Sequence, residues 1–183
     1  MNKKLIIAVL LLVVIGGGYY WWANPKTEFD PSYDPVIDPA EFSTNITNPY
    51  FSLPVGKKIV FKAEAKEGAE RIEILITGET KEVEGVTTLI YHDMEYLNGE
   101  LIEDTRDYLA QDREGNVWYF GEDVDNYENG VVKDHDGAWL SGVDGAKAGI
   151  WFPGDPRVGD SYRQEYYFGQ ADEIVEVVET GVI

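Results

Sequence analysis

Apolar and polar residues alternate along much of the chain after residue 42, with the period of two that is typical of β-strands. In the stretch KIVFKAEA, residues 58–65, every second side chain is apolar. The stretch ERIEILIT, residues 70–77, repeats the pattern, and so does the segment 86–92. Such alternation predicts half-buried strands of an antiparallel sheet with one face toward solvent.

Turn signals separate these segments at short intervals. Asn98-Gly99 is the strongest of them, because both central residues of a type I′ turn need positive φ. Gly115 suits the left-handed position that closes a hairpin between residues 105–110 and 116–120. The dipeptides Glu84-Gly85 and Asn129-Gly130 predict two further turns.

The succession of strands and turns predicts an all-β fold. Residues 161–168 and 173–180 add two late strands, which gives an antiparallel meander of about eight to ten short strands. Such a sheet usually curls to protect its edges, so we expect an open barrel or half-barrel. A β-sandwich of two sheets is the alternative.

The N-terminal segment has a different character. Residues 5–23 form an uncharged, mostly apolar run, which as a helix is just long enough to cross the hydrocarbon core of a bilayer and predicts one transmembrane anchor. Lys3 and Lys4 precede it, so residues 1–4 are expected in the cytoplasm and everything after residue 23 outside the cell membrane. A cleaved signal peptide is the alternative, and it also exports the rest of the chain.

Residues 24–41 contain Asp-Pro at three places, at regular intervals. Each proline restricts its own φ and biases the preceding residue to extended geometry, so this segment is expected to be a semi-rigid spacer. Residues 42–183 then form the extracytoplasmic β-domain. The chain ends soon after a predicted strand and Gly181, which suggests a C-terminally truncated meander.

Composition narrows the possible partners. The 183 residues carry a formal charge of −19 and include no cysteine. Nucleic acid is excluded as a partner, because phosphate binding needs clustered Lys and Arg. The missing cysteines exclude disulfides, thiolate metal sites and a cysteine nucleophile. Divalent cations, in contrast, are expected to gather near so acidic a domain.

Trp118, Tyr119 and Phe120 are the candidate ligand-binding residues. They stand in succession, so both faces of their strand are covered by apolar or aromatic groups. Either the strand is packed on both sides as part of the core, or one of its faces lines a pocket for an apolar or sugar ligand.

Asp123, Asp125 and Glu128 are the candidate metal ligands. They follow the aromatic run in a segment rich in carboxylates, and Ca²⁺ prefers several oxygen ligands from a flexible loop. The spacing is not that of an EF-hand loop. A solvated acidic loop without metal is the alternative.

Two longer stretches carry a resemblance to a family. AQDREGNVWYFGED, residues 110–123, and GAWLSGVDGAKAGIWFPGDPRVGDSYRQEYYFGQADE, residues 137–173, resemble an uncharacterised family of bacterial exported or membrane-anchored proteins. The resemblance covers about residues 42 to 180. It implies an extracytoplasmic β-rich domain with further strands beyond this chain's end, and it carries no catalytic or binding residues to transfer.

Together these features predict a membrane-anchored, extracytoplasmic, non-enzymatic domain that binds a small ligand or an envelope protein. A calcium-stabilised structural or adhesive domain is one alternative. A hydrolase that uses two carboxylates is another, and Glu122 with Glu165 is one of many pairs available among 34 acidic residues.

Overall fold

The computed structural model describes residues 30–181. By its contacts the chain divides into two units, Met1–Asp30 and Pro31–Ile183. The predicted anchor, residues 5–23, lies outside the described residues. Within residues 30–181, no helix combines the length and apolar character needed to cross a membrane.

Eleven antiparallel strands form one sheet in the described part of the chain. They are β1 (Lys58–Glu64), β2 (Ala69–Leu75), β3 (Thr80–Val83), β4 (Val86–Leu97), β5 (Glu100–Gln111), β6 (Val117–Glu128), β7 (Val131–Asp134), β8 (Trp139–Leu140), β9 (Lys147–Phe152), β10 (Ser161–Tyr167) and β11 (Ala171–Glu176). A 3-10 helix, η1 (Pro39–Glu41), precedes them.

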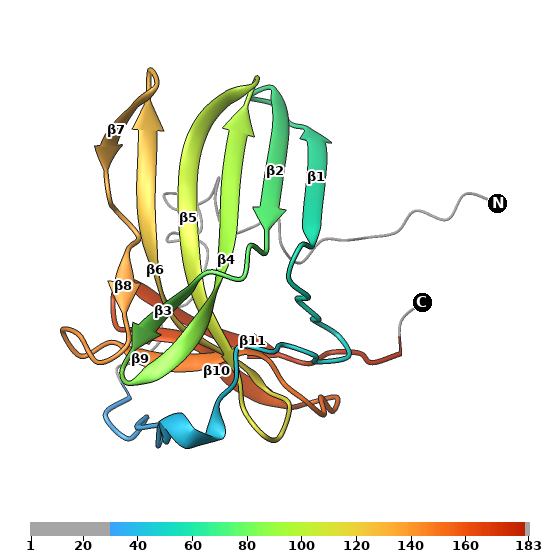
Figure 1. Ribbon diagram of the computed structural model, residues 1–183, viewed down its shortest axis with the longest axis vertical. Helices are drawn as coiled ribbons and strands as arrows, with labels where there is room; N and C mark the ends of the chain where they lie inside the picture. Colours follow the sequence, from blue (N-terminus) through green and yellow to red (C-terminus); the bar gives the residue numbers. More distant parts are fainter. Residues whose placement is uncertain (1–29, 182–183) are drawn as a thin grey trace. The chain divides into compact units, whose positions relative to one another are not determined.

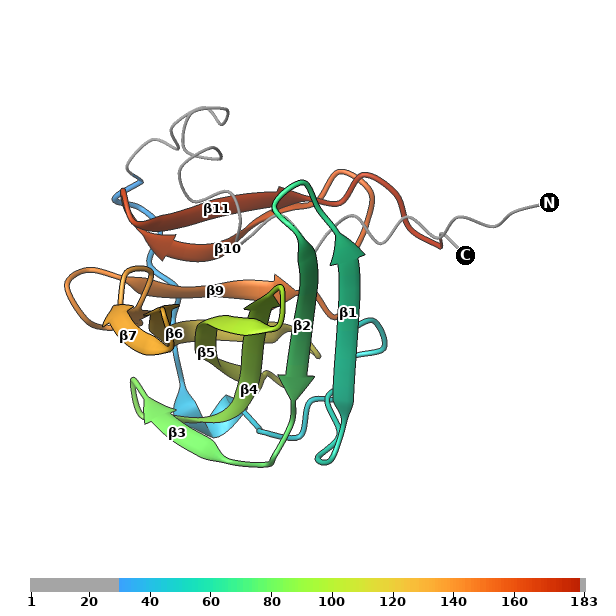
Figure 2. The same ribbon diagram turned by 90° about the horizontal axis from the view of Figure 1, so that it is seen from above.

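The strand order is β1-β2-β4-β5-β6-β9-β10-β11, with β3 beside β4 and with β7 and β8 beside β6 (Figure 1). In Figure 2, β1 and β2 run upright on the right of the view, whereas β9, β10 and β11 run nearly horizontally above β5 and β6. The antiparallel sheet therefore forms an open half-barrel, which confirms the predicted all-β class. The sandwich alternative is wrong, because the strands belong to one hydrogen-bonded sheet.

The turns explain why consecutive strands pair. Asn98 and Gly99 have φ values of 53° and 87° and connect β4 to β5, as their sequence predicted. In the β5–β6 hairpin, Ala110 lies opposite Trp118, so this predicted pairing is confirmed as well. The carboxylate of Asp112 fixes that loop by accepting a 2.9 Å hydrogen bond from the backbone N–H of Asn116.

Hydrophobic side chains pack on both faces of the sheet. One cluster comprises Ile46, Leu53, Ile74, Ile76, Leu89, Tyr91, Leu109, Val117, Tyr119, Trp139 and Ala146. Phe61 of β1 and Tyr167 of β10 both pack against this cluster, so it lies where the two ends of the sheet curl toward each other. We call this side the inner face. The other side, the outer face, carries a smaller cluster of Val83, Val86, Tyr108, Ala110, Phe120 and Ala148.

Residues 31–41, which belong to the predicted spacer, pack against the sheet. The Tyr33 hydroxyl donates a 2.7 Å hydrogen bond to the carbonyl of Ala148, and its ring lies 5.3 Å from that of Tyr166. Asp34 forms an ion pair of 2.6 Å with Lys147. This part of the chain is therefore fixed to β9 and β10.

Candidate functional site

Carboxyl side chains from neighbouring strands of the sheet gather on the inner face. They are Glu70 of β2, Asp93 and Glu95 of β4, Glu103 and Asp107 of β5, Glu122 of β6, Glu165 of β10 and Glu173 of β11. We call these eight residues the inner acidic cluster. Alternation places them there: Asp93 and Glu95 lie two and four positions after Tyr91, which belongs to the inner hydrophobic cluster.

The strand register brings several of these carboxyl groups face to face. Asp107 lies opposite Glu122, and Glu95 lies opposite Glu103. Directly opposed like charges destabilise a sheet. The opposed carboxyl groups are therefore more stable when they are protonated or when a positively charged group lies beside them.

Burial also favours the protonated forms of the two carboxyl groups on β4, Asp93 and Glu95. It raises the pKa of Asp93 to about 7, with a further contribution from the charge of Glu103. It raises the pKa of Glu95, whose side chain is only 6% exposed, to about 9. At neutral pH these groups are therefore largely protonated or on the point of losing a proton.

A second group of carboxyls lies where β5, β6 and β10 approach one another. Burial and the charge of Glu165 raise the pKa of Glu122 to about 8, and burial and the charge of Glu173 raise that of Glu165 to about 8. Burial and the charge of Glu122 raise the pKa of Asp107 well above its usual range, although the Tyr119 hydroxyl donates a 2.7 Å hydrogen bond to it.

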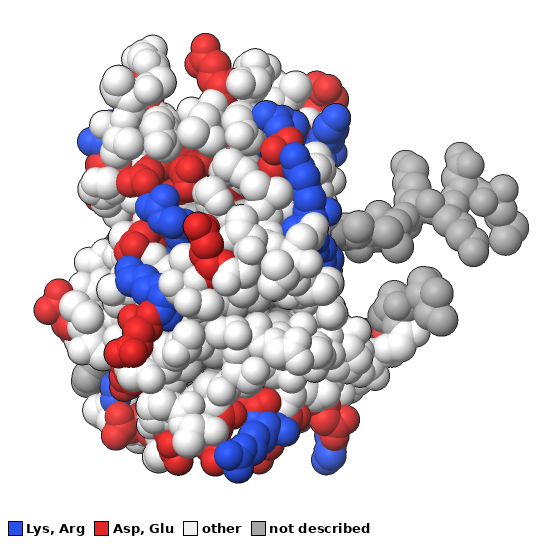
Figure 3. Space-filling view, in the orientation of Figure 1, with Lys and Arg blue, Asp and Glu red and all other residues white. Residues whose placement is uncertain are grey.

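The ion pairs of the described residues lie outside the inner acidic cluster. Lys81 lies 2.9 Å from Asp123, and Arg106 bridges Asp104 and Asp125 at 3.2 and 2.8 Å. Figure 3 shows Lys and Arg side chains beside Asp and Glu on the side of the domain that it presents. Within residues 30–181, no ion pair involves a member of the inner acidic cluster. Outer-face acids such as Asp123 and Asp125 thus have basic partners among the described residues, whereas the inner acids do not.

Trp139 places a buried hydrogen-bond donor on the inner face, beside Glu122. Its side chain is 5% exposed, and its indole N–H has no hydrogen-bond partner among the described residues. The indole N–H favours the ionised forms of Glu122 and Glu165 and so lowers their pKa values, although burial outweighs this effect. β8 holds the indole there by pairing with β6, where Glu122 lies opposite Trp139.

Two carboxyl oxygens of the cluster are also buried without a partner among residues 30–181: Oδ1 of Asp93 and Oε1 of Glu70. An unsatisfied buried polar group costs about 1–3 kcal/mol. Together with the Trp139 N–H, these atoms give the inner face unused hydrogen-bonding capacity.

Aromatic rings adjoin the carboxyl groups. The Tyr119 ring lies 5.1 Å from that of Trp139 and 4.5 Å from that of Trp151, both edge to face. The centroid of the Tyr91 ring lies 5.9 Å from that of the Trp151 ring. The inner face therefore combines acidic groups with aromatic rings, of which Tyr91, Tyr119 and Trp139 are buried and Trp151 is partly buried. Carboxyl groups and an accessible ring both favour positively charged ligands.

The three aromatic residues that the sequence singled out do not share one surface. Tyr119 belongs to the inner face and hydrogen-bonds Asp107. Phe120 is fully buried in the outer cluster, and Trp118 packs against that cluster while its indole donates to Asp112 at 2.7 Å. Alternation along β6 separates them, so only Tyr119 lies in the candidate site.

The three predicted metal ligands lie along β6 rather than in a loop, because the strand continues to Glu128. Asp123 accepts hydrogen bonds from Lys81 and Tyr108; burial raises its pKa, but these bonds outweigh burial and lower it below its usual value. Asp125 pairs with Arg106, and Glu128 is exposed. Among residues 30–181, no three His, Asp or Glu side chains are placed to hold one metal ion.

A pocket of about 190 Å³ lies between residues 34–37 and the segment 141–148. Within it, the buried Ser141 hydroxyl donates a 2.5 Å hydrogen bond to Glu84, and Lys147 is paired with Asp34. Its polar side chains thus satisfy one another, in contrast to those of the inner acidic cluster.

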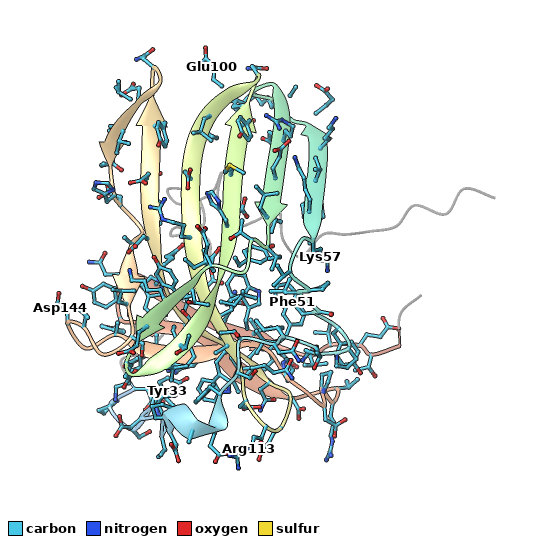
Figure 4. All side chains as sticks on the ribbon, in the orientation of Figure 1. Tyr33, Phe51, Lys57, Glu100, Arg113 and Asp144 are labelled. Atoms are coloured by element: carbon cyan, nitrogen blue, oxygen red, sulfur yellow. The ribbon has the colours of Figure 1, made fainter. Side chains whose placement is uncertain are left out.

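Figure 4 places Glu100 at one end of the long strands and Arg113 at the other. The inner acidic cluster extends between these ends, along the middle of β4, β5 and β6. Comparisons with protein-family models, curated proteins and solved structures found no match to this chain.

Proposed function

We propose that this domain is a non-enzymatic binding protein whose ligand occupies the inner face of the half-barrel. One observation carries the proposal: eight carboxyl groups gather on that face beside aromatic rings, and the ion pairs of the described residues leave these carboxyl groups out. A ligand that supplies positive charge or hydrogen-bond donors compensates them.

Stability alone does not account for such a cluster. Replacing buried charged groups by apolar residues of similar volume is often neutral or stabilising. Buried acids such as Glu95 and Asp107 therefore represent a cost to folding, and costs of this kind are typical of functional sites. This argument favours a binding role over a purely structural one.

The cellular setting belongs to the same proposal. The uncharged run at residues 5–23 supports an anchor in the cell membrane, with the β-domain outside and the N-terminus in the cytoplasm. The ligand is then a molecule of the envelope or of the surroundings.

Ligand screening by thermal denaturation tests the binding role. The full chain is heated with panels of amines, sugars, organic acids and calcium chloride, since a ligand that binds only the native state raises the Tm. A stabilising ligand is then titrated by NMR, and we expect the largest shifts at inner-face residues such as Tyr91 and Tyr119. Shifts confined to outer-face residues such as Arg106 contradict the proposal.

A hydrolase is the second candidate, favoured by the proximity of Glu122 and Glu165. The charge of Glu165 contributes to raising the pKa of Glu122, and the Trp139 N–H faces both groups. Paired carboxyl groups with one held protonated are typical of glycoside hydrolases. Turnover of chromogenic glycosides that disappears in both Glu122→Gln and Glu165→Gln supports this candidate, and no turnover by the wild-type chain contradicts it.

A further inference from the structure

We propose that the ligand of the inner face is a linear aliphatic polyamine. This inference rests on the proposed binding function and specifies the chemistry of its ligand. It follows from the spread of the carboxyl groups, the rings between them and the buried donor of Trp139.

The spread of the cluster argues against a single ion. A hard cation such as Ca²⁺ needs several oxygen ligands that converge on one point. In residues 30–181, no three acidic or histidine side chains converge in this way. In a sheet, the Cβ atoms of directly opposed residues are about 5 Å apart, and residues at alternate positions of one strand are about 7 Å apart. Asp107 and Glu122 exemplify the first spacing, and Asp93 and Glu95 the second.

A polyamine matches this distribution. Its ammonium groups are separated by short methylene chains, so one molecule brings several positive charges in a row. Each ammonium group donates several hydrogen bonds, and one oxygen each of Asp93 and Glu70 lacks a donor among the described residues.

The aromatic residues suit the rest of such a ligand. Tyr91, Tyr119 and Trp151 pack against one another beside the carboxyls. Tyr91 and Tyr119 are almost fully buried, so the partly buried Trp151 is the ring among the three that offers surface to ammonium and methylene groups. A sugar, in contrast, carries no charge to compensate the cluster.

Trp139 provides the independent observation. The residue is 5% exposed, and its N–H lacks a partner among the described residues and faces Glu122 and Glu165. When an ammonium group displaces the protons of these acids, the ionised carboxylates become acceptors only. They then accept from both the ammonium group and the indole, which satisfies a donor that the unliganded domain leaves unused.

Binding must then be coupled to proton release. The groups that face one another across the site are Glu70 from β2, Asp93 and Glu95 from β4, Glu103 and Asp107 from β5, Glu122 from β6, Glu165 from β10 and Glu173 from β11, with the hydroxyls of Tyr91 and Tyr119. Since several of these acids hold protons near pH 7, a polyamine displaces them on binding.

Isothermal titration of spermidine into the full chain tests the inference. It is carried out at pH 7.5 in about 0.15 M NaCl, where the Debye length is about 8 Å, so weak attraction to the acidic surface is screened. Titrations in two buffers with different ionisation enthalpies measure the protons released. We expect saturable binding, with heats that differ between the buffers.

Two variants on β5 separate the inner face from the general charge of the protein. Asp107→Asn removes an inner carboxylate, whereas Asp104→Asn removes one on the outer face of the same strand. We expect the first to weaken spermidine binding at least about tenfold and the second to leave it unchanged. Circular dichroism verifies folding, and Glu122→Gln with Glu128→Gln as its control replaces the pair if either variant fails to fold.

Equal affinity in both variants overturns the inference, because it indicates attraction to the surface. Binding of calcium or of an uncharged sugar at the inner face, with no binding of spermidine, overturns the polyamine while the binding function stands. If no ligand of any class binds at the inner face, both proposals fail.

Discussion

Asp107 lies directly opposite Glu122 in the register of β5 and β6, and the Tyr119 hydroxyl donates a hydrogen bond to the Asp107 carboxyl. Two carboxyl groups held together in this way share protons rather than ionise independently. Their protonation, and that of the other inner acids, should control both the stability of the domain and its binding.

The first prediction concerns pH. The inner acids have pKa values above those of the unfolded chain, so their contribution to stability is complete below about pH 4.5 and is lost as the pH rises through 7 to 9. Asp123, whose pKa is lowered, contributes in the opposite sense and loses its contribution only in acid. We therefore expect the Tm to be higher at pH 5 than at pH 8.5 by thermal denaturation. A Tm that is constant or rises across this interval contradicts the assignment.

The second prediction concerns Glu122→Gln. The neutral amide has the shape of the protonated acid and carries no charge beside Glu165, so no proton needs to be held at high pH. We expect the free energy of unfolding at pH 8.5 to rise by roughly 1–3 kcal/mol, since one pKa unit corresponds to about 1.4 kcal/mol. Urea denaturation at pH 8.5 and pH 5 measures it, with little change expected at pH 5. The exposed Glu128→Gln serves as control, and a loss of stability at pH 8.5 in Glu122→Gln is incompatible with a protonated Glu122.

The third prediction concerns Gly121, which positions Trp139. Gly121 has a φ of 121°, and an added Cβ overlaps the carbonyl oxygen of Trp139. We expect Gly121→Ala to destabilise the domain by about 3 kcal/mol or more and to alter the fluorescence of the tryptophans. Gly130 has a φ of 76° with open space around it, so Gly130→Ala should cost only about 1 kcal/mol. Equal losses in the two variants argue against close packing of β8 on β6.

The fourth prediction tests the attachment of residues 31–41. Tyr33→Phe removes the hydrogen bond to the carbonyl of Ala148, and we expect a loss of about 1 kcal/mol in unfolding free energy. Tyr50→Phe removes the hydroxyl of an exposed tyrosine and should leave stability almost unchanged, as is usual for surface substitutions. Urea denaturation of both variants provides the comparison, and an unchanged Tyr33→Phe shows that this segment is not held in solution.

The strands and turns were predictable from the sequence because their signals are local. Period-two alternation located β1 and β2, and Asn98-Gly99 fixed the β4–β5 turn through its positive φ values. The docking of Tyr33 onto Ala148 was not predictable, because a spacer pattern carries no information about contacts with a strand so distant in the sequence.

The inner acidic cluster was missed for a different reason. Around Asp93 and Glu95 both alternating sets of residues contain polar groups, so polarity does not identify the face that points inward. Sequence reasoning assigns acids to solvent by default, because buried carboxyls are rare. Glu122 and Glu165 were named only as one pair among many, and the fold is what brings them together with Trp139.

The protonation of the inner acids can be measured most directly by following the side-chain carboxyl carbons of the full chain by NMR between pH 3 and 10. We predict that several Asp and Glu resonances titrate with midpoints between about pH 7 and 9, and that Glu122→Gln removes one of them and shifts that of Glu165. If every carboxyl group titrates below about pH 5.5, the inner face carries ordinary solvated acids. That result would contradict both the buried cluster and the binding site inferred from it.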